Sequence, residues 1–344
     1  MQRGLSATLR PDSDIRRRCV EVAAPEVLVV SYGQDDGPTE LLASLRAQTL
    51  APARIHVWHN GPTFPPRPIA GVEQHWSGVG VGYGEGINQL LSRTRAAKTL
   101  IATDDVVLDK ECLARIAEEM EEHPRAVAVG CALVDSSGLV NAYGLRLTAD
   151  WVGVNTDRGR PWAEFARDAP RGAAPYLGPS GALFALNREE WERVAGGPIF
   201  PRSFFLYMED VIFGVRLRFL RAEVRFRPDA FASHAWSVAT GKRSAEKLRL
   251  VERNRLWMLR AARGRIGATR CLPWTALRYA SYLRERASAP RSGSAPKAFW
   301  RAMSEGLFGD LPADVRDYLH EVTGRSLPRW CFASFREQSR NPVS

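Results

Sequence analysis

Four short apolar segments recur along the first 131 residues, and stretches with helical spacing separate them. Glu26–Ser31, Arg54–Trp58, Lys98–Ala102 and Ala126–Cys131 are rich in Val, Ile, Leu or Ala, which is typical of buried strands. Strands that alternate with helices indicate parallel βαβ units. The sequence therefore predicts an α/β fold with a Rossmann-like, mostly parallel and doubly wound central sheet flanked by helices. The intervening helices are expected at Pro38–Gln48, Gly86–Thr94 and Lys110–Glu122.

The second half of the chain is less regular. Residues 134–175 hold many Gly, Asp and Trp residues and are expected to wrap a cleft. After a strand at Ser180–Leu186, an amphipathic helix is predicted over Glu209–Leu220, and two short strands are expected between residues 223 and 232. The remainder is mainly helical. The expected division is a disordered tail over 1–22, an α/β domain over 23–240 and a helical, basic C-terminal region over 241–344.

The composition is that of a globular protein, with 45% hydrophobic and 25% charged residues among 344. No apolar run approaches the length that spans a bilayer, and the Arg-rich start lacks the apolar segment of a secretory signal. The five cysteines are odd in number and form no C-x-x-C pair. This pattern argues against a disulfide framework or a thiolate zinc site and favours a reducing cytoplasm.

The net charge of +10 comes entirely from the last third of the chain. Residues 241–344 hold 21 Lys or Arg against 9 Asp or Glu, whereas residues 1–240 hold 27 against 29. Charge alone shows only where anions collect. The surplus therefore fits a solvated helical surface, an anionic membrane face, a diphosphate-bearing acceptor or nucleic acid.

Two pairs of adjacent carboxylates lie about a hundred residues apart. Asp104-Asp105 follows the third strand, and Glu209-Asp210 opens a predicted helix; both are expected to lead into helices. Adjacent carboxylates repel each other and favour a shared cation or proton. Either pair alone would also fit a helix start, where acidic residues cap the helix and suit its dipole. Together they predict a metal-held anionic group at the first pair and a general base at the second.

Other polar residues also follow predicted strands. The carboxyl ends of parallel strands share one edge of a sheet, so Ser31, Asn60 and Asp104 are expected to line one crevice. His234 follows a later strand and is expected to return there, although a lone histidine is more often structural. The glycine run 78–86 fits neither a dinucleotide fingerprint nor a P-loop. It is expected to be a loop that lies close to a nucleotide, or a flexible surface loop.

In this order the motifs resemble glycosyltransferase family 2, which has the GT-A fold, and especially its bacterial rhamnosyltransferase-like members. The resemblance covers roughly residues 27–259, and the ordered set is much more specific than any single motif. The matching segments are Val29-Val30-Ser31-Tyr32, Asn60-Gly61, Gly82 to Asn88, Thr103-Asp104-Asp105, Ser180-Gly181-Ala182, Gly196-Gly197, Phe204 to Asp210, His234 and Arg253-Asn254-Arg255.

The resemblance implies a metal-assisted, inverting transfer of one sugar from a UDP-, dTDP- or GDP-sugar to an acceptor hydroxyl. Asp210 would be the general base, and Glu209 would help to place the acceptor. Asp105, with Asp104 nearby, would hold Mg²⁺ or Mn²⁺ against the donor diphosphate, and His234 would be a metal ligand or phosphate contact. The implied donor-binding residues are Ser31, Tyr32, Asn60, Gly82, Gly84, Asn88, Asp104 and Asp105.

Two departures from the family pattern bear on specificity. His59 stands where the family has an Asp that reads the donor base, which leaves the base open. The metal motif is Thr-Asp-Asp rather than Asp-x-Asp, which favours weak metal dependence. The Gln-x-x-Arg-Trp motif of processive members is absent, which favours single-sugar transfer. Lys242 and Arg243 are expected, from their charge and the neighbouring Gly241, to form a clamp over the phosphates.

The acceptor implied by the resemblance is a glycan, a lipid-linked glycan or a small molecule, as in cell-wall or polysaccharide biosynthesis. We expect the protein in the cytoplasm, with the inner face of the plasma membrane as a site of peripheral contact.

The alternative functions are a sugar nucleotidyltransferase, disfavoured because no Lys or Arg follows the first strand, and a non-catalytic carbohydrate- or nucleic-acid-binding protein. Nucleic acid is the less expected partner. The residues expected either to rest on an anionic interface or to pack on the α/β domain are Arg249, Arg253, Arg260, Arg263 and Arg265, with Leu250, Leu256, Trp257 and Leu259.

Overall fold

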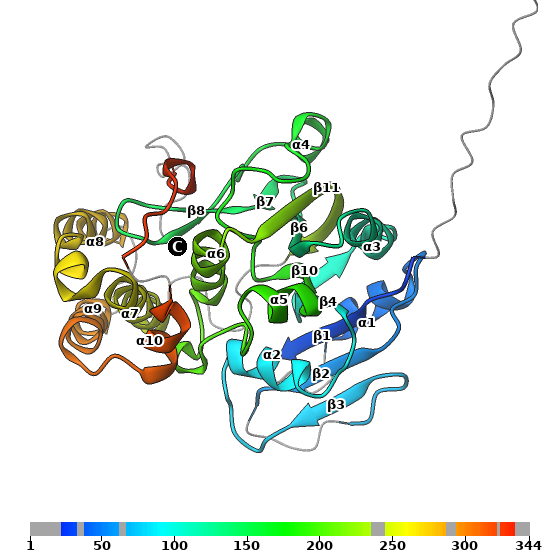
Figure 1. Cartoon of the computed structure of the whole chain (residues 1–344), viewed down its shortest axis with the longest axis horizontal. Coiled ribbons are helices and arrows are strands. Elements are labelled where there is room, and N and C mark those ends of the chain that lie inside the picture. The colour runs from blue at the N-terminus through cyan, green and yellow to red at the C-terminus, as the bar shows by residue number, and fades with distance from the viewer. Residues whose placement is uncertain are drawn as a thin grey trace, which may run out of the picture.

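A nine-stranded sheet crosses the molecule, and helices cover both of its faces (Figure 1). The computed structural model describes residues 22–32, 38–61, 67–234, 245–286, 294–321 and 324–333. The strands are β1 (Glu26–Ser31), β2 (Ile55–His59), β3 (Glu73–Trp76), β4 (Lys98–Thr103), β5 (Val106–Leu108), β6 (Ala126–Val134), β7 (Val140–Ala142), β8 (Leu145–Leu147), β9 (Gly153–Asn155), β10 (Leu183–Asn187) and β11 (Glu223–His234). The α-helices are α1 (Thr39–Arg46), α2 (Tyr83–Leu91), α3 (Cys112–Glu122), α4 (Trp162–Asp168), α5 (Arg188–Val194), α6 (Glu209–Phe219), α7 (Ala245–Thr269), α8 (Leu272–Arg286), α9 (Ser294–Met303) and α10 (Ala313–His320).

The sheet is mixed. Its strand order is β3-β2-β1-β4-β10-β6-β11-β5, with β7 beside β6. The first four strands of this order are parallel, and three of them, β1, β2 and β4, were predicted. β10 then lies antiparallel between β4 and β6, and β5 is antiparallel to β11. The α/β class and a central sheet flanked by helices are confirmed, and antiparallel strands interrupt the parallel order beyond β4.

The first strand shows why an apolar run becomes a central strand. Successive side chains of a strand point to opposite faces. In β1, Leu28 and Val30 enter one hydrophobic cluster, and Val27 and Val29 enter a second cluster on the other face. All four are at most 1% exposed. A strand covered on both faces needs a continuous apolar sequence rather than an alternating one.

Helices complete these two clusters. On one face, α1 contributes Leu41 and α3 contributes Ile116. On the other face, α2 contributes Ile87, α5 contributes Trp191 and α6 contributes Ile212. The sheet is therefore enclosed between helices from both halves of the chain, and the polar residues that follow its strands are left at the sheet edge.

The helices α7 to α10 form the predicted helical C-terminal region and gather at one side of the molecule (Figure 1). A buried ion network joins two of them to the turn before β9. Arg255 Nη2 lies 2.9 Å from Glu252 Oε2, and Arg278 Nη2 lies 2.9 Å from Asp150 Oδ2. Burial alone would raise the pKa of Glu252, but Arg278 and Arg255 lower it to about 2. Removing one partner would leave an uncompensated buried charge.

The apolar side chains of α7 pack inward. Trp257 and Leu259 join the cluster that contains Leu28 and Val30, as the packing alternative expects, whereas Leu256 packs against α9. Arg249 pairs with Glu305 at 2.6 Å, and Arg263 and Arg265 are exposed. Within the described residues, no helix is long and apolar enough to cross a membrane. The buried members are Leu250, Leu256, Trp257 and Leu259.

Several segments differ from their predictions. Asp104 and Asp105 form a turn into β5 rather than a helix start. The second half of the glycine run is helical, because α2 begins at Tyr83. β11 is one strand with an irregularity between Arg227 and Phe231, not two strands. Most of the expected tail, the 240/241 boundary, and Lys242 and Arg243 lie outside the described residues.

Candidate active site

A cavity of about 260 Å³ brings the two carboxylate pairs together. Four of the residues that line it are Asp104, Asp105, Glu209 and Asp210, which are far apart in the sequence. β4 ends at the first pair, and α6 begins at the second. The two pairs therefore face one space, as predicted. The other lining residues are Tyr32, Tyr83, Thr103, Asn141, Asn155, Ser180, Gly181, Ala182, Leu206, Tyr207, Met208, His234 and Lys247.

The pairing of β11 with β5 places His234 at the first carboxylate pair. In this antiparallel register His234 is opposite Val106, the residue after Asp105. His234 Nε2 lies 3.4 Å from Asp105 Oδ2, and Thr103 Oγ1 donates to Asp105 Oδ1 at 2.7 Å. Burial alone would raise the pKa of Asp105, but His234 and Thr103 outweigh it and lower the pKa. The Asp105 carboxylate is thus held ionised.

Asp104 differs from its neighbour. Its Oδ2 accepts a hydrogen bond of 2.9 Å from the backbone N–H of Tyr32, at the end of β1. Burial nevertheless raises the pKa of Asp104. This contact ties β1 to the turn after β4, so the first pair has a fixed position at the sheet edge.

Asp105 and His234 fit one divalent cation. Neighbouring ligands of an octahedral ion with bonds of about 2.1 Å lie about 3 Å apart, and the observed N···O separation is 3.4 Å. The buried Nδ1 of His234 has no hydrogen-bond partner among the described residues, so no second contact fixes its tautomer. One carboxylate and one imidazole leave most coordination positions for water or a diphosphate, which suits Mg²⁺ or Mn²⁺.

The second carboxylate pair opens α6. Asp210 Oδ2 accepts from Gly181 N at 3.0 Å, and its Oδ1 accepts from Val211 N at 2.9 Å. Burial raises the pKa of Asp210 despite these bonds. Glu209 is 5% exposed, and its Oε1 has no hydrogen-bond partner among the described residues. Burial, with the nearby Asp210 charge, raises the pKa of Glu209 to about 8. At neutral pH Glu209 is therefore largely protonated.

The loop that leads into α6 has unusual backbone geometry. Phe205, Tyr207 and Met208 all have positive φ, between 65° and 72°. Such conformations are costly for large side chains and persist where the surroundings enforce them. Asn254 Nδ2 donates to three carbonyls of this loop, and Tyr83 N donates to the Phe205 carbonyl at 2.8 Å. The C-terminal region thus fixes the approach to Asp210.

The residues expected to hold the donor divide into two groups. Tyr32, Asp104 and Asp105 line the cavity. Ser31, Asn60, Gly82, Gly84 and Asn88 do not line it as it stands, and two of them brace backbone nearby. Asn60 Oδ1 accepts from Val81 N at 2.6 Å, and Asn88 Nδ2 donates to the Phe200 carbonyl at 2.8 Å. Their donor contacts stay predictions.

Sequence reasoning missed several cavity residues. Tyr83 donates from its hydroxyl to the Gly181 carbonyl at 2.5 Å. Lys247 Nζ lies 5.4 Å from the ring centroid of Tyr207, and burial lowers the pKa of Lys247. Tyr83 lay in an expected loop and Lys247 in an expected basic surface. In the sequence, the only sign that Tyr83 lines the cavity is its place as a tyrosine among glycines. Nothing in the sequence distinguishes Lys247 from its basic neighbours.

Comparisons with known proteins give structural likeness only. No protein-family model matches the sequence, and the comparison with curated proteins finds no match. The structure is similar to S. aureus TarS, with a TM-score of 0.47 and 16% identity over 69% of this chain and 40% of that chain. It is also similar to GalNAc-T7 solved with UDP, GalNAc and Mn²⁺, with a TM-score of 0.49 and 10% identity over 69% of this chain and 50% of that chain. The chain thus spans half or less of the length of these two proteins.

Proposed function

We propose that the protein is an inverting glycosyltransferase with a GT-A fold that moves one sugar from a nucleotide-diphosphate sugar to an acceptor hydroxyl. The observation that carries this proposal is the meeting of two carboxylate pairs in one cavity, in which Asp105 differs in electrostatic character from Glu209 and Asp210. The pKa of Asp105 is lowered and the pKa values of Glu209 and Asp210 are raised. An ionised carboxylate suits a cation, and a carboxylate of raised pKa suits a base.

The first pair would bind the donor diphosphate through a metal ion. Asp105 and His234 would hold Mg²⁺ or Mn²⁺, with Asp104 alongside. When bound, the ion neutralises negative charge that develops on the leaving nucleotide. Lys247 lines the same cavity and supplies a further cation for the phosphates. Lys242 and Arg243 stay proposed as part of that clamp.

The second pair would act on the acceptor. Asp210 lines the cavity, and the N–H groups of Gly181 and Val211 fix its carboxylate. It would take the proton from the acceptor hydroxyl as that oxygen attacks the anomeric carbon. Glu209, largely protonated at neutral pH, would donate a hydrogen bond that places the acceptor. Attack from the face opposite the nucleotide inverts the anomeric centre.

The nucleotide would lie along the carboxyl ends of β1, β2 and β4. Tyr32 lines the cavity there, and Ser31 is completely buried beside it. The base-reading position is His59, whose Nε2 lies 2.9 Å from Gln74 Oε1. An imidazole paired with an amide does not form the same hydrogen bonds to a nucleotide base as a carboxylate does. His59 therefore leaves the identity of the nucleotide base open, and the proposed donors are UDP-, dTDP- and GDP-sugars. Single-sugar transfer in the cytoplasm, to a glycan, lipid-linked or small-molecule acceptor, completes the proposal.

The decisive experiment is a donor screen with site variants. Purified protein is incubated with UDP-, dTDP- and GDP-sugars with Mg²⁺ or Mn²⁺, and nucleotide release is measured. One donor should be hydrolysed in a metal-dependent manner, and Asp105→Ala should abolish that dependence. Asp210→Asn should keep nucleotide binding but lower turnover by about 10²- to 10⁴-fold.

The matched control is Asp168→Asn, an exposed carboxylate paired with Arg160 outside the cavity. It should leave turnover unchanged. Absence of both turnover and nucleotide binding with every donor would refute the proposal. Turnover that survives in Asp210→Asn would refute the assignment of the base alone.

A membrane contact is better supported at α8 and α9 than on α7. A cavity of about 590 Å³ lies between them, lined mainly by apolar side chains such as Tyr279 and Phe299. Trp300 is 68% exposed and Phe308 79% exposed at its rim. Residues 260–301 contain ten Lys or Arg and one acidic residue. Of these, Arg270, Arg284 and Lys297 are exposed on α8 or α9 or directly beside them, whereas Arg260 is buried and the Arg278 side chain is only 12% exposed. Exposed aromatic side chains and cations on the same helices complement an anionic lipid bilayer, which we take as the occupant of this face.

A further inference from the structure

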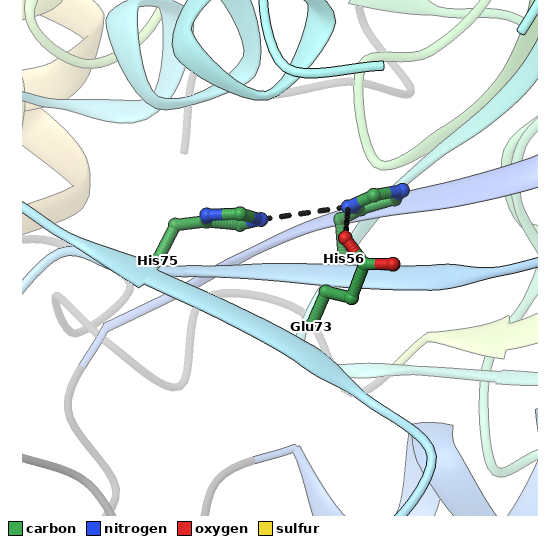
Figure 2. A group of neighbouring side chains, drawn as sticks. All are labelled: His56, Glu73 and His75. Atoms are coloured by element: carbon green, nitrogen blue, oxygen red, sulfur yellow. Dashed lines mark hydrogen bonds and ion pairs between the residues drawn. The ribbon is translucent and has the colours of Figure 1, made fainter. Parts of the chain in front are cut away.

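A second cluster of potential metal ligands lies away from the catalytic cavity, at the edge of the sheet. It comprises His56 on β2 and Glu73 and His75 on β3 (Figure 2). The parallel register pairs His56 with Glu73, and it pairs Trp58 with His75. Side chains two residues apart along a strand lie on the same face. The register therefore places all three groups on one face of the sheet.

The three groups turn their ligand atoms toward one another. His56 Nδ1 lies 3.4 Å from His75 Nε2 and 3.3 Å from Glu73 Oε2 (Figure 2). All three ligand atoms fall within 4.8 Å of each other. With metal–ligand bonds of about 2.0–2.1 Å, two ligands of a tetrahedral Zn²⁺ lie about 3.3–3.4 Å apart. Both separations at His56 match the edges of such a tetrahedron.

The outer contact of His56 orients it for this role. Its other ring nitrogen, Nε2, lies 2.9 Å from Glu26 Oε2, and Thr94 donates a hydrogen bond to the same oxygen. A hydrogen on Nε2 directed at Glu26 leaves the lone pair of Nδ1 facing Glu73 and His75. A carboxylate behind a ligating histidine is the usual arrangement at zinc sites. His56 is 2% exposed, so its ring has little freedom to turn away.

We propose that His56, Glu73 and His75 bind one Zn²⁺ ion in a tetrahedral site whose fourth position is open to water. Two imidazoles among three ligands favour zinc, because imidazole suits Zn²⁺ better than it suits the harder Mg²⁺ and Ca²⁺. The Glu73 side chain is 49% exposed, so the ion can enter from solvent. Bound zinc would tie the edge strand β3 to β2 and lower the tendency of that edge to open.

The described residues contain a second group of potential metal ligands, and it lacks the features that orient His56. Glu119, Glu122 and His123 are also close enough to share an ion. However, both carboxylate oxygens of Glu119 are paired, Oε1 with Arg225 at 2.5 Å and Oε2 with Arg227 at 3.7 Å. In Glu73, Oε1 pairs with an arginine, whereas Oε2 faces His56. Among the described residues, no carboxylate lies behind His123 as Glu26 lies behind His56. This group serves as the control.

The test is titration of metal-free protein with Co²⁺, which reports coordination geometry through its visible absorption. Wild type should show the intense bands of tetrahedral cobalt, lost on adding one equivalent of Zn²⁺. His75→Ala and Glu73→Gln should each weaken binding at least tenfold, and Glu26→Gln by about 10- to 100-fold. Asp105→Ala should keep the bands, which separates this site from the proposed catalytic ion.

Two matched variants sharpen the test. His123→Ala should bind Co²⁺ like wild type. Arg54→Gln removes the 3.2 Å ion pair to Glu73 Oε1 without removing a ligand, so it should bind at least as tightly. Folding is checked by circular dichroism on each metal-free variant, and the exposed Glu73→Gln keeps the test valid if a histidine variant unfolds.

Weak octahedral bands in wild type, or unchanged affinity in His75→Ala and Glu73→Gln, would overturn the proposal. The cluster would then be a hydrogen-bonded network in which the His56 ring lies between Glu26 and Glu73.

Discussion

The side-chain amide of Asn254 donates a hydrogen bond of 2.9 Å to the carbonyl of Tyr207, two residues before Glu209. The same Nδ2 also reaches the carbonyls of Phe204 and Leu206 at 2.9 and 3.0 Å. One fully buried side chain on α7 thus holds the loop of positive φ that sets the start of α6. The C-terminal helices are therefore part of what positions the proposed base.

Asn254→Ala should lower turnover with little effect on nucleotide binding. The loop would lose its shared donor, and a misplacement of about 1 Å at a reacting group costs roughly 100-fold in rate. Unpaired buried carbonyls should also lower the free energy of unfolding by about 1–3 kcal/mol. Steady-state kinetics and denaturant unfolding measure the two effects separately.

The control is Asn187→Ala. Asn187 is buried, its side chain caps the start of α5, and its amide donates a hydrogen bond to the carbonyl of Pro124. It should cost about 1 kcal/mol of stability while leaving kcat unchanged. Equal loss of kcat in both variants would mean that Asn254 acts only through global stability.

The raised pKa of Glu209 predicts a pH-dependent stability. The pKa moves from 4.5 in the unfolded chain to about 8 in the folded protein. Between these values the unfolded chain releases a proton that the folded protein keeps. The free energy of unfolding should therefore be highest below about pH 4.5 for this group and fall as pH rises to 8, on the order of a few kcal/mol.

Glu209→Gln isolates that contribution, because an amide does not titrate. In metal-free protein, the difference in unfolding free energy between the variant and wild type should grow in favour of the variant from pH 5 to 8. Urea unfolding at several pH values measures it. A constant difference across this range would show that Glu209 titrates normally.

The close approach of Gly82 to the same loop predicts a further loss. Gly82 has φ of +88°, and a Cβ there would lie 2.0 Å from the Phe205 carbonyl oxygen. Gly82→Ala should therefore displace the loop, lower stability by more than the roughly 1 kcal/mol of backbone strain, and lower kcat.

Gly138→Ala is the matched control for Gly82→Ala. Gly138 has φ of +75°, but no atom lies within 4 Å of a Cβ added there. It should show only the strain cost, with normal kcat. If Gly82→Ala and Gly138→Ala had the same effect on kcat, the contact of residue 82 with the Phe205 loop would not be the cause of the loss.

The central strands were predictable because burial on both faces leaves a continuous apolar signature. Val27 to Val30 make β1 recognisable without any knowledge of its neighbours. The edge strand β3, with the sequence Glu-Gln-His-Trp, was missed because one partner and partial exposure require no apolar pattern. The candidate zinc ligands Glu73 and His75 went unnoticed with it.

The meeting of Asp105 with His234 was predictable from the motif order, but its cause was not. It depends on the antiparallel pairing of β5 with β11, and β5 was not predicted from the sequence. The contribution of Asn254 was equally hidden, since three carbonyl contacts to one amide depend on how α7 packs against the loop. Contacts between elements are a tertiary property that local pattern does not encode.

The apolar face between α8 and α9 predicts binding to anionic lipid vesicles. Wild type should sediment with vesicles that contain an anionic phospholipid and not with neutral ones, and added salt should weaken the binding. The double variant Trp300→Ser, Phe308→Ser removes two exposed aromatic side chains and should lower binding at least tenfold. Val79→Ser, which changes a side chain 61% exposed elsewhere on the surface, should not.

Charge-reversal variants test the binding to lipid vesicles independently of the aromatic side chains. Each Lys or Arg near an anionic surface contributes about 1 kcal/mol, so Arg270→Glu with Lys297→Glu should also lower binding at least tenfold. Arg95→Glu, an exposed residue between α2 and β4, should leave binding unchanged. Concentration-dependent dimers that disappear in the aromatic double variant, with no vesicle binding by wild type, would assign this face to a second copy of the chain. Both arms failing together would leave the exposed basic residues of this region as a solvated surface, because neither aromatic insertion nor lipid charge would then contribute.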